Sequence, residues 1–155
     1  MNVSHWLLWG FVATCVLTTI MSGSTGLGLT RISLPFMLGT MFTPDRDKAK
    51  LVGFGVHLVD GWLFSLLYVA AFEALHAAGW WRGAIIGGIH GAFVLTVGVA
   101  LLPGLHPRMA SEQHGPELAR ALEPPGFLAL NYGVRTPVTV FAAHVIFGTI
   151  LGAFY

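Results

Sequence analysis

Long apolar stretches of the sequence contain one aspartate and three histidines, groups that are rare in such stretches: Asp60, His57, His90 and His144. On a helix, residues spaced by three, four, seven or eleven share a face, so His57, Asp60 and Tyr68 form one stripe. A carboxylate near the centre of a bilayer costs about 2.5 to 3.5 kcal/mol on insertion scales, and it normally pairs, takes up a proton or meets water. The spacing therefore predicts an intramembrane polar cluster of His57, Asp60, Tyr68, His90 and His144.

Three kinds of chemistry fit such a cluster. His57 is the nearest candidate partner of Asp60, and the two could relay protons as intramembrane His and Asp do in pumps. His57 and His144, predicted at one depth on different helices, could bind a metal ion or supply the axial ligands of haem b. His90 is predicted about a turn nearer the opposite boundary, which disfavours a zinc or copper site of three histidines. The simplest alternative is an interhelical hydrogen bond that holds the helices in register.

Glycines recur at helical spacing beside these histidines. Gly83, Gly87 and Gly91 repeat every four residues, and His90 lies on the same face. Small residues at this spacing let helix backbones approach closely, so the histidines are expected on packing faces and not on lipid faces. The complete set of predicted helix-packing residues is Gly53, Gly61, Gly83, Gly87, Gly91, Gly148 and Gly152.

The composition is typical of a membrane protein. Of 155 residues, 55% are apolar and only 10% are charged, whereas soluble domains usually carry about a quarter charged residues. Crossing about 30 Å of hydrocarbon requires roughly 20 apolar residues. We predict an all-α integral membrane protein, a single domain over residues 1–155 that forms a four-transmembrane-helix bundle. The four predicted spans are 6–21, 51–72, 83–102 and 137–155.

The basic residues indicate an orientation. Seven of the eight Lys and Arg lie in the connections 22–50 and 103–136, and the positive-inside rule makes that side cytoplasmic. We therefore predict a multi-pass membrane protein with both termini on the outer side and the long loops cytoplasmic. Aromatic side chains near the predicted outer boundary agree with this orientation: Trp6, Trp9, Trp80, Trp81 and Tyr155.

The second and fourth predicted spans share a pattern. Both fit H-x3-G-x6-Y, running from His57 to Tyr68 and from His144 to Tyr155, and a Thr-Pro dipeptide precedes each span. We interpret this as two tandem helix-pair repeats, 1–79 and 80–155. Each repeat holds an even number of spans, so the two insert in the same orientation. Phe147 then stands where the first repeat has Asp60.

The cytoplasmic connections contain three further features. Two apolar segments, 34–42 and 125–132, are too short to span and are predicted to be interfacial or re-entrant. The connection 103–136 balances its charges, which predicts a solvated cap. Its Leu-His-Pro-Arg stretch, stiffened by prolines, is the alternative: a ligand site at His106 and Arg108.

Three segments of the sequence are similar to those of a known group of membrane proteins. The segments 34–44, 57–68 and 102–109 resemble those of small bacterial four-helix inner-membrane proteins whose function is uncharacterised. The resemblance covers most of the chain. It implies a four-helix protein of the bacterial inner membrane, whose outward-facing termini would then be periplasmic. It implies no catalytic residue or cofactor.

Three functions follow as expectations. The first is a structural or accessory subunit of a membrane complex, in contact with the lipid bilayer and with other membrane subunits or further copies of the chain. The second is a small proton- or ion-coupled transporter, and the third is a membrane protein that binds haem b or a metal ion. A formal charge of +1 argues against nucleic acid. The sequence holds no phosphate loop, nucleophile elbow or zinc-protease motif, which favours a protein that is not an enzyme.

Overall fold

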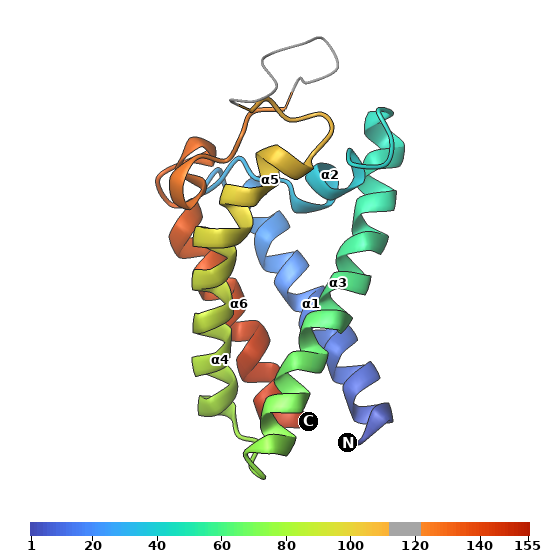
Figure 1. Cartoon of the computed structure of the whole chain (residues 1–155), viewed down its shortest axis with the longest axis vertical. Helices are drawn as coiled ribbons and strands as arrows, with labels where there is room; N and C mark the ends of the chain where they lie inside the picture. Colours follow the sequence, from blue (N-terminus) through green and yellow to red (C-terminus); the bar gives the residue numbers. More distant parts are fainter. Residues whose placement is uncertain (112–121) are drawn as a thin grey trace.

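The computed structural model describes residues 1–111 and 122–155, and these ranges contain helices but no β-strand. Four stretches are long and apolar enough to cross a membrane: α1 (Val3–Gly26), α3 (Arg46–Ala74), the stretch Trp80–Leu105 and α6 (Thr136–Phe154). They stand side by side, with both chain ends at the same end of the bundle (Figure 1). The predicted all-helical fold with four long apolar helices is thus confirmed.

Helix α1 is longer than the predicted span 6–21, and it also contains several polar residues within that span. The hydroxyls of Thr14, Thr18 and Thr19 each donate to the carbonyl oxygen four residues earlier, at 2.7 to 2.8 Å. Threonines that satisfy their hydroxyls in this way present mainly methyl groups, so they do not interrupt an apolar helix. The small residues after Met21 continue the helix to Gly26.

The third long stretch changes its helical geometry midway. Helix α4 (Trp80–Phe93) runs into a π-helical turn, η1 (Val94–Gly98), and then into α5 (Val99–Leu105). Pro103 lies inside α5 and has no N–H to donate to the preceding turn. Wide turns and prolines are the usual causes of helix bends, and α5 leans across the end of the bundle in Figure 1.

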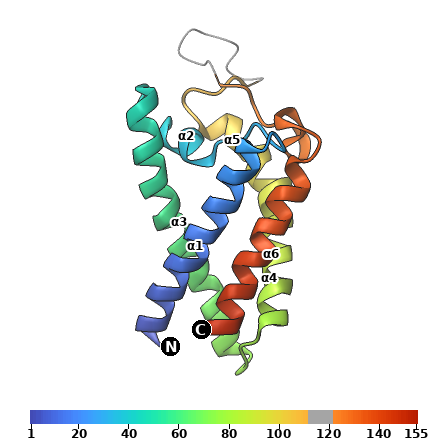
Figure 2. The same cartoon turned by 180° about the vertical axis from the view of Figure 1, so that it is seen from behind.

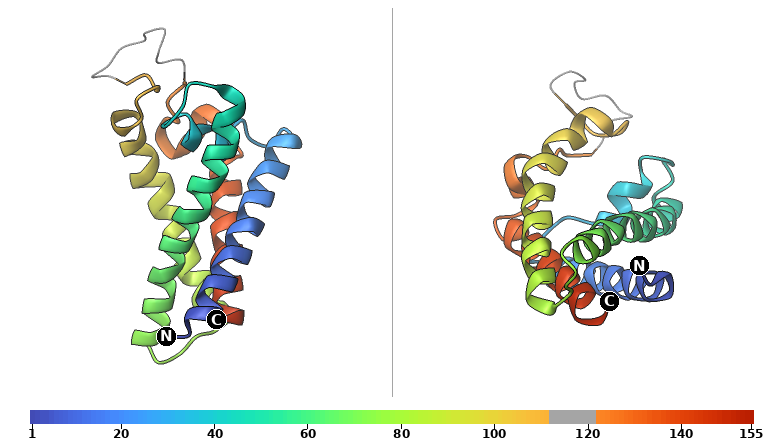
Figure 3. Two further views of the ribbon diagram at one scale, coloured as in Figure 1. Left: turned by 90° about the vertical axis from the view of Figure 1, so that its right-hand side faces the viewer. Right: turned by 60° about the horizontal axis from the view of Figure 1, so that its bottom comes forward.

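The long helices pack unequally. Helix α4 lies along α6 over most of its length, and α1 lies between α6 and α3 (Figure 2). Helix α3 contacts α6 over a short stretch only. Viewed along the bundle, α3 and α1 form one side and α4 and α6 the other (Figure 3).

Two short helices lie at the end of the bundle opposite the termini, within the segments 34–42 and 125–132. Helix α2 (Leu34–Gly39) packs against α3, and η2 (Phe127–Tyr132) is a 3₁₀ helix that precedes α6. Close approach of α2 depends on glycine, since a Cβ at Gly53 would overlap the carbonyl group of Pro35. Gly53 therefore packs against a short helix and not against another span.

The core lies between α1, α3 and α6, where Tyr68, Phe147 and Leu151 are fully buried. Outward positions are also apolar, and Leu63, Ile85 and many similar side chains are more than half exposed. A bundle with an apolar exterior of this extent suits a lipid environment, because contact between so much apolar surface and water is unfavourable.

Candidate functional site

Three helices bring a tyrosine and two histidines together inside the bundle. The Tyr68 hydroxyl on α3 lies 3.0 Å from Nδ1 of His90 on α4. The imidazole rings of His90 and His144, the latter on α6, are 4.7 Å apart between centroids and nearly perpendicular. The predicted stagger of His90 relative to His144 therefore does not separate the two rings.

The tautomer of neutral His144 follows from its environment. Its Nδ1 lies 2.8 Å from the carbonyl oxygen of Val140. A carbonyl only accepts hydrogen bonds, so Nδ1 carries the proton and donates it. Nε2 is then the nitrogen with a free lone pair, available to a proton or a ligand. Because the His144 side chain is buried, any such ligand must come from inside the bundle.

Aromatic rings hold this cluster in place. Phe64 stacks on His90 at 4.4 Å between centroids, and Phe147 meets the Tyr68 ring edge-on at 5.4 Å. Phe147, which stands opposite Asp60 in the proposed repeat, thus packs directly against the cluster. Such aromatic pairs are worth about 0.5 to 1.5 kcal/mol beyond burial, so they fix the ring positions.

His57 lies near this cluster without a hydrogen-bond partner. Its Nε2 is buried and makes no hydrogen bond within residues 1–111 and 122–155. Its position on α3 shares the helical face that carries Phe64 and Tyr68. An unpaired buried polar atom costs about 1 to 3 kcal/mol. A proton or a ligand on Nε2 would offset this cost.

Asp60 is half-buried at the middle of α3, equally far from Arg46 and Ala74. In the part of the chain that the structure describes, its carboxylate forms no hydrogen bond and no ion pair. The expected contact between Asp60 and His57 is therefore not formed there, although the two residues share a face of α3.

The cluster can hold and pass a proton, because tyrosine and histidine both donate and accept hydrogen bonds. No three His, Cys, Asp or Glu residues in the described ranges are placed to share a metal ion. Haem b with His57 and His144 as axial ligands stays a prediction. A Soret band in the purified protein would establish it.

Glycines build the contact between α4 and α6 that positions His90 and His144. A Cβ at Gly83 would overlap the carbonyl of Gly148, and one at Gly87 would overlap that of His144. The same applies at Gly148 against Gly83. Gly91 and Gly152 also face this contact, whereas Gly61 meets the Thr14 side chain on α1. Backbone contact of this kind fixes the helices at a short distance.

Hydrogen bonds from His106 and Arg108 join α2 and the residue after it to the end of α5. Nδ1 of the buried His106 ring accepts from the Arg108 backbone N–H at 3.1 Å, so Nε2 carries the ring proton and donates to the Met37 carbonyl at 2.9 Å. The Arg108 guanidinium donates to the Thr40 carbonyl. Both residues of the predicted ligand site are thus engaged in internal hydrogen bonds.

We expect His106→Ala to destabilise the protein by about 1 to 3 kcal/mol, since it removes the ring nitrogen that accepts from the Arg108 backbone N–H. The measurement is thermal unfolding of the detergent-solubilised chain, with His5→Ala, an exposed histidine, as the matched control. Equal melting temperatures for the two variants would show that the His106 contacts contribute nothing.

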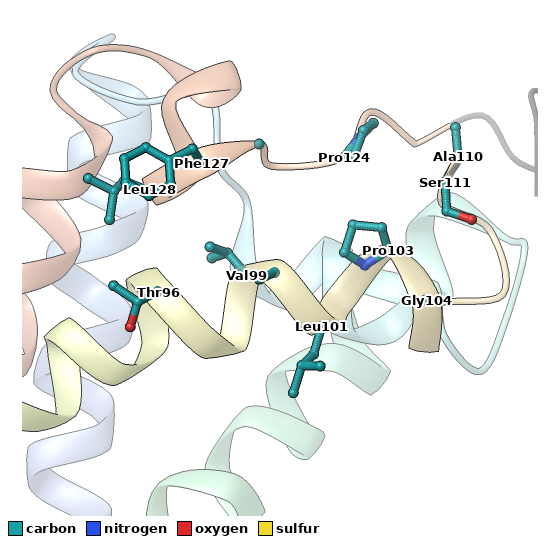
Figure 4. Close-up of a pocket in the computed structure, with 12 residues that line it drawn as sticks. Thr96, Val99, Leu101, Pro103, Gly104, Ala110, Ser111, Pro124, Phe127 and Leu128 are labelled. Carbon is teal, nitrogen blue, oxygen red and sulfur yellow. The ribbon is translucent and has the colours of Figure 1, made fainter. Parts of the chain in front are cut away.

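Four further residues of the predicted solvated cap, Glu112, His114, Glu117 and Arg120, lie outside the described residues. The Glu123 carboxylate is described and lies 3.4 Å from the Arg31 guanidinium. Helices α5 and η2 border an apolar cavity of about 710 Å³ (Figure 4). Val99 and Pro103 lie on the side of this helical stretch that faces Phe127 and Leu128. Among the residues that the structure describes, its lining contains no Lys or Arg.

Comparison with known protein families, curated proteins and solved structures gave no match for this chain. The candidate site therefore has to be interpreted from its own geometry.

Proposed function

We propose that the chain is an integral membrane protein whose four long helices cross the bilayer, with both termini periplasmic. The support is the length and apolar character of these helices and the apolar side chains on their outer surface. Basic residues at the start of α3 and in the connections at that end of the bundle favour the cytoplasmic assignment of that end.

Within the membrane, the function supported best is that of a subunit of a larger membrane complex. The observation that carries this proposal is Asp60, a half-buried carboxylate at the centre of a predicted span without a partner in the described residues. An isolated carboxylate at that depth is costly. A hydrogen-bond donor or a cation from another membrane helix would offset the cost.

The surroundings of Asp60 suit a helix-helix contact. Leu63 and Leu67 follow it by three and seven residues and share its face of α3. Their side chains are 60% and 63% exposed, so this face is uncovered in the single chain. The partner helix is either another membrane protein or a second copy of this chain.

The test is the mass of the protein extracted with its native lipids into polymer nanodiscs and measured by native mass spectrometry. We expect an assembly heavier than one chain, and peptide sequencing of its components would identify a homo-oligomer or a separate partner. A particle that contains one copy of this chain and lipid alone would refute the subunit proposal.

Internal duplication is part of the same proposal. The pair α1 and α3 corresponds to the pair formed by α4 and α6, and each second helix follows a short helical segment, α2 or η2. Tyr68 and Tyr155 end the shared sequence pattern, with Tyr68 inside α3 and Tyr155 directly after the last residue of α6. Tandem repeats at 1–79 and 80–155 account for these correspondences.

A second candidate function is proton-coupled transport, favoured by the contact between Tyr68, His90 and His144. If these groups carry protons, His144→Phe abolishes proton flux in proteoliposomes, because phenylalanine fills the same space without a titratable nitrogen. Dye-reported flux is the measurement, and His5→Phe is the control. Undiminished flux in His144→Phe would exclude the cluster as the path.

A further inference from the structure

A groove of about 680 Å³ lies between α1 and α3, beside α2 and near the end of the bundle opposite the termini. A Cβ added at Gly23 would meet nothing within 4 Å, so the groove is open beside this residue. The groove is a different space from the cavity beside α5. It is lined by residues of three segments: Cys15, Thr18, Thr19, Ser22 and Gly23; Ser33 and Pro35; Lys50 and Phe54.

Three hydrogen-bond donors gather at the outer end of this groove. The Lys50 ammonium and the hydroxyls of Ser22 and Ser33 belong to exposed residues. Within the described ranges, none of the three side chains forms a hydrogen bond or an ion pair. Lys48, two residues earlier, differs because its ammonium lies 3.5 Å from the Asp45 carboxylate.

The deeper part of the groove is apolar. Phe54 lies one turn of α3 below Lys50, and Cys15 lies about two turns of α1 below Ser22. The intervening Thr18 and Thr19 turn their hydroxyls onto backbone carbonyls. Cationic and hydroxyl groups therefore border the outer end, and an apolar wall continues from them along the helices.

This polarity matches that of a phospholipid. Lysine binds phosphate as a point charge, and hydroxyls donate to phosphate oxygens. Basic pockets between transmembrane helices are established sites for acidic lipid head groups. We propose that the groove binds one phospholipid with an anionic head group, its phosphate on Lys50, Ser22 and Ser33 and one acyl chain against Phe54. This inference rests on the proposed membrane insertion.

The test uses the full chain in detergent and counts bound lipid by native mass spectrometry. Phosphatidylglycerol and phosphatidylcholine with identical acyl chains are the probes. We expect tighter binding of phosphatidylglycerol, and a loss of about fivefold in its affinity in Lys50→Gln, since one basic residue near the membrane surface is worth about that factor. Lys48→Gln, the matched control, keeps the wild-type preference.

Three results would overturn the inference. They are equal affinity for the two lipids in the wild type, an equal loss in the two lysine variants, and glycerol phosphate binding as tightly as phosphatidylglycerol. The last result would mean that a free phosphate group suffices. Flotation with vesicles is measured on the same samples, because a chain that fails to float contradicts membrane insertion, whereas a floating chain without lipid preference contradicts only the lipid site.

Discussion

Gly148→Ala is expected to separate α6 from α4 and to destabilise the protein by about 1 to 3 kcal/mol or more. The added Cβ would overlap the carbonyl oxygen of Gly83 and would lie 2.9 Å from the Tyr68 ring. A backbone atom cannot move aside as a flexible side chain does, so the helices themselves must shift. The substitution therefore also displaces Tyr68 from His90.

The measurement is thermal unfolding in detergent, together with near-ultraviolet circular dichroism, which reports the packing of the aromatic side chains. Gly55→Ala is the matched control, since a Cβ on that residue of α3 meets nothing within 4 Å. Alanine is the better helix former by about 1 kcal/mol, so the control is expected to be neutral or slightly stabilising. Equal destabilisation in both variants would remove the role assigned to the contact between α4 and α6.

Asp60→Leu is expected to dissociate the proposed complex, with a five- to thirtyfold weaker association, because a polar contact between membrane helices is worth about 1 to 2 kcal/mol. Leucine inserts into a bilayer more readily than aspartate. A loss of assembly therefore reflects the missing polar contact and not a failure to insert. Native mass spectrometry of nanodisc-extracted protein reports the ratio of complex to single chain.

Two further variants sharpen this measurement. Asp60→Asn keeps the shape and a hydrogen-bonding group, and it is expected to retain most of the assembly. Asp47→Leu removes an exposed carboxylate near the start of the same helix and should leave assembly unchanged. If Asp60→Leu assembles as well as the wild type, Asp60 does not hold the complex together.

Hydrophobicity alone predicted the four long helices, because a span must be long and apolar whatever it packs against. The boundaries were harder to place. Hydropathy ends the first span at Met21, yet the helix continues through the polar residues 22–26, where the Thr25 hydroxyl donates to the Met21 carbonyl at 3.0 Å. The π-helical turn at Val94–Gly98 also has no signal in an apolar pattern.

The candidate site could likewise be predicted only in part. Helical spacing identified the faces that carry His57, His90 and His144, since a periodic pattern is a local property. Which residues meet across the bundle depends on how closely α4 and α6 approach and on their relative shift, and depth counting placed His90 and His144 too far apart. The contacts of His106 with α2 depend on the path of a loop, which local patterns do not encode.

The proposed function requires that the face of α3 containing Asp60 contacts another membrane helix. Its most direct test is photo-cross-linking in intact membranes from a benzophenone amino acid at position 67, on that face. The comparison site is position 89, an isoleucine of α4 that is similarly exposed in the single chain. If a partner helix lies on that face, position 67 gives a discrete protein adduct and position 89 gives none. Adducts to lipid alone from both positions would contradict it.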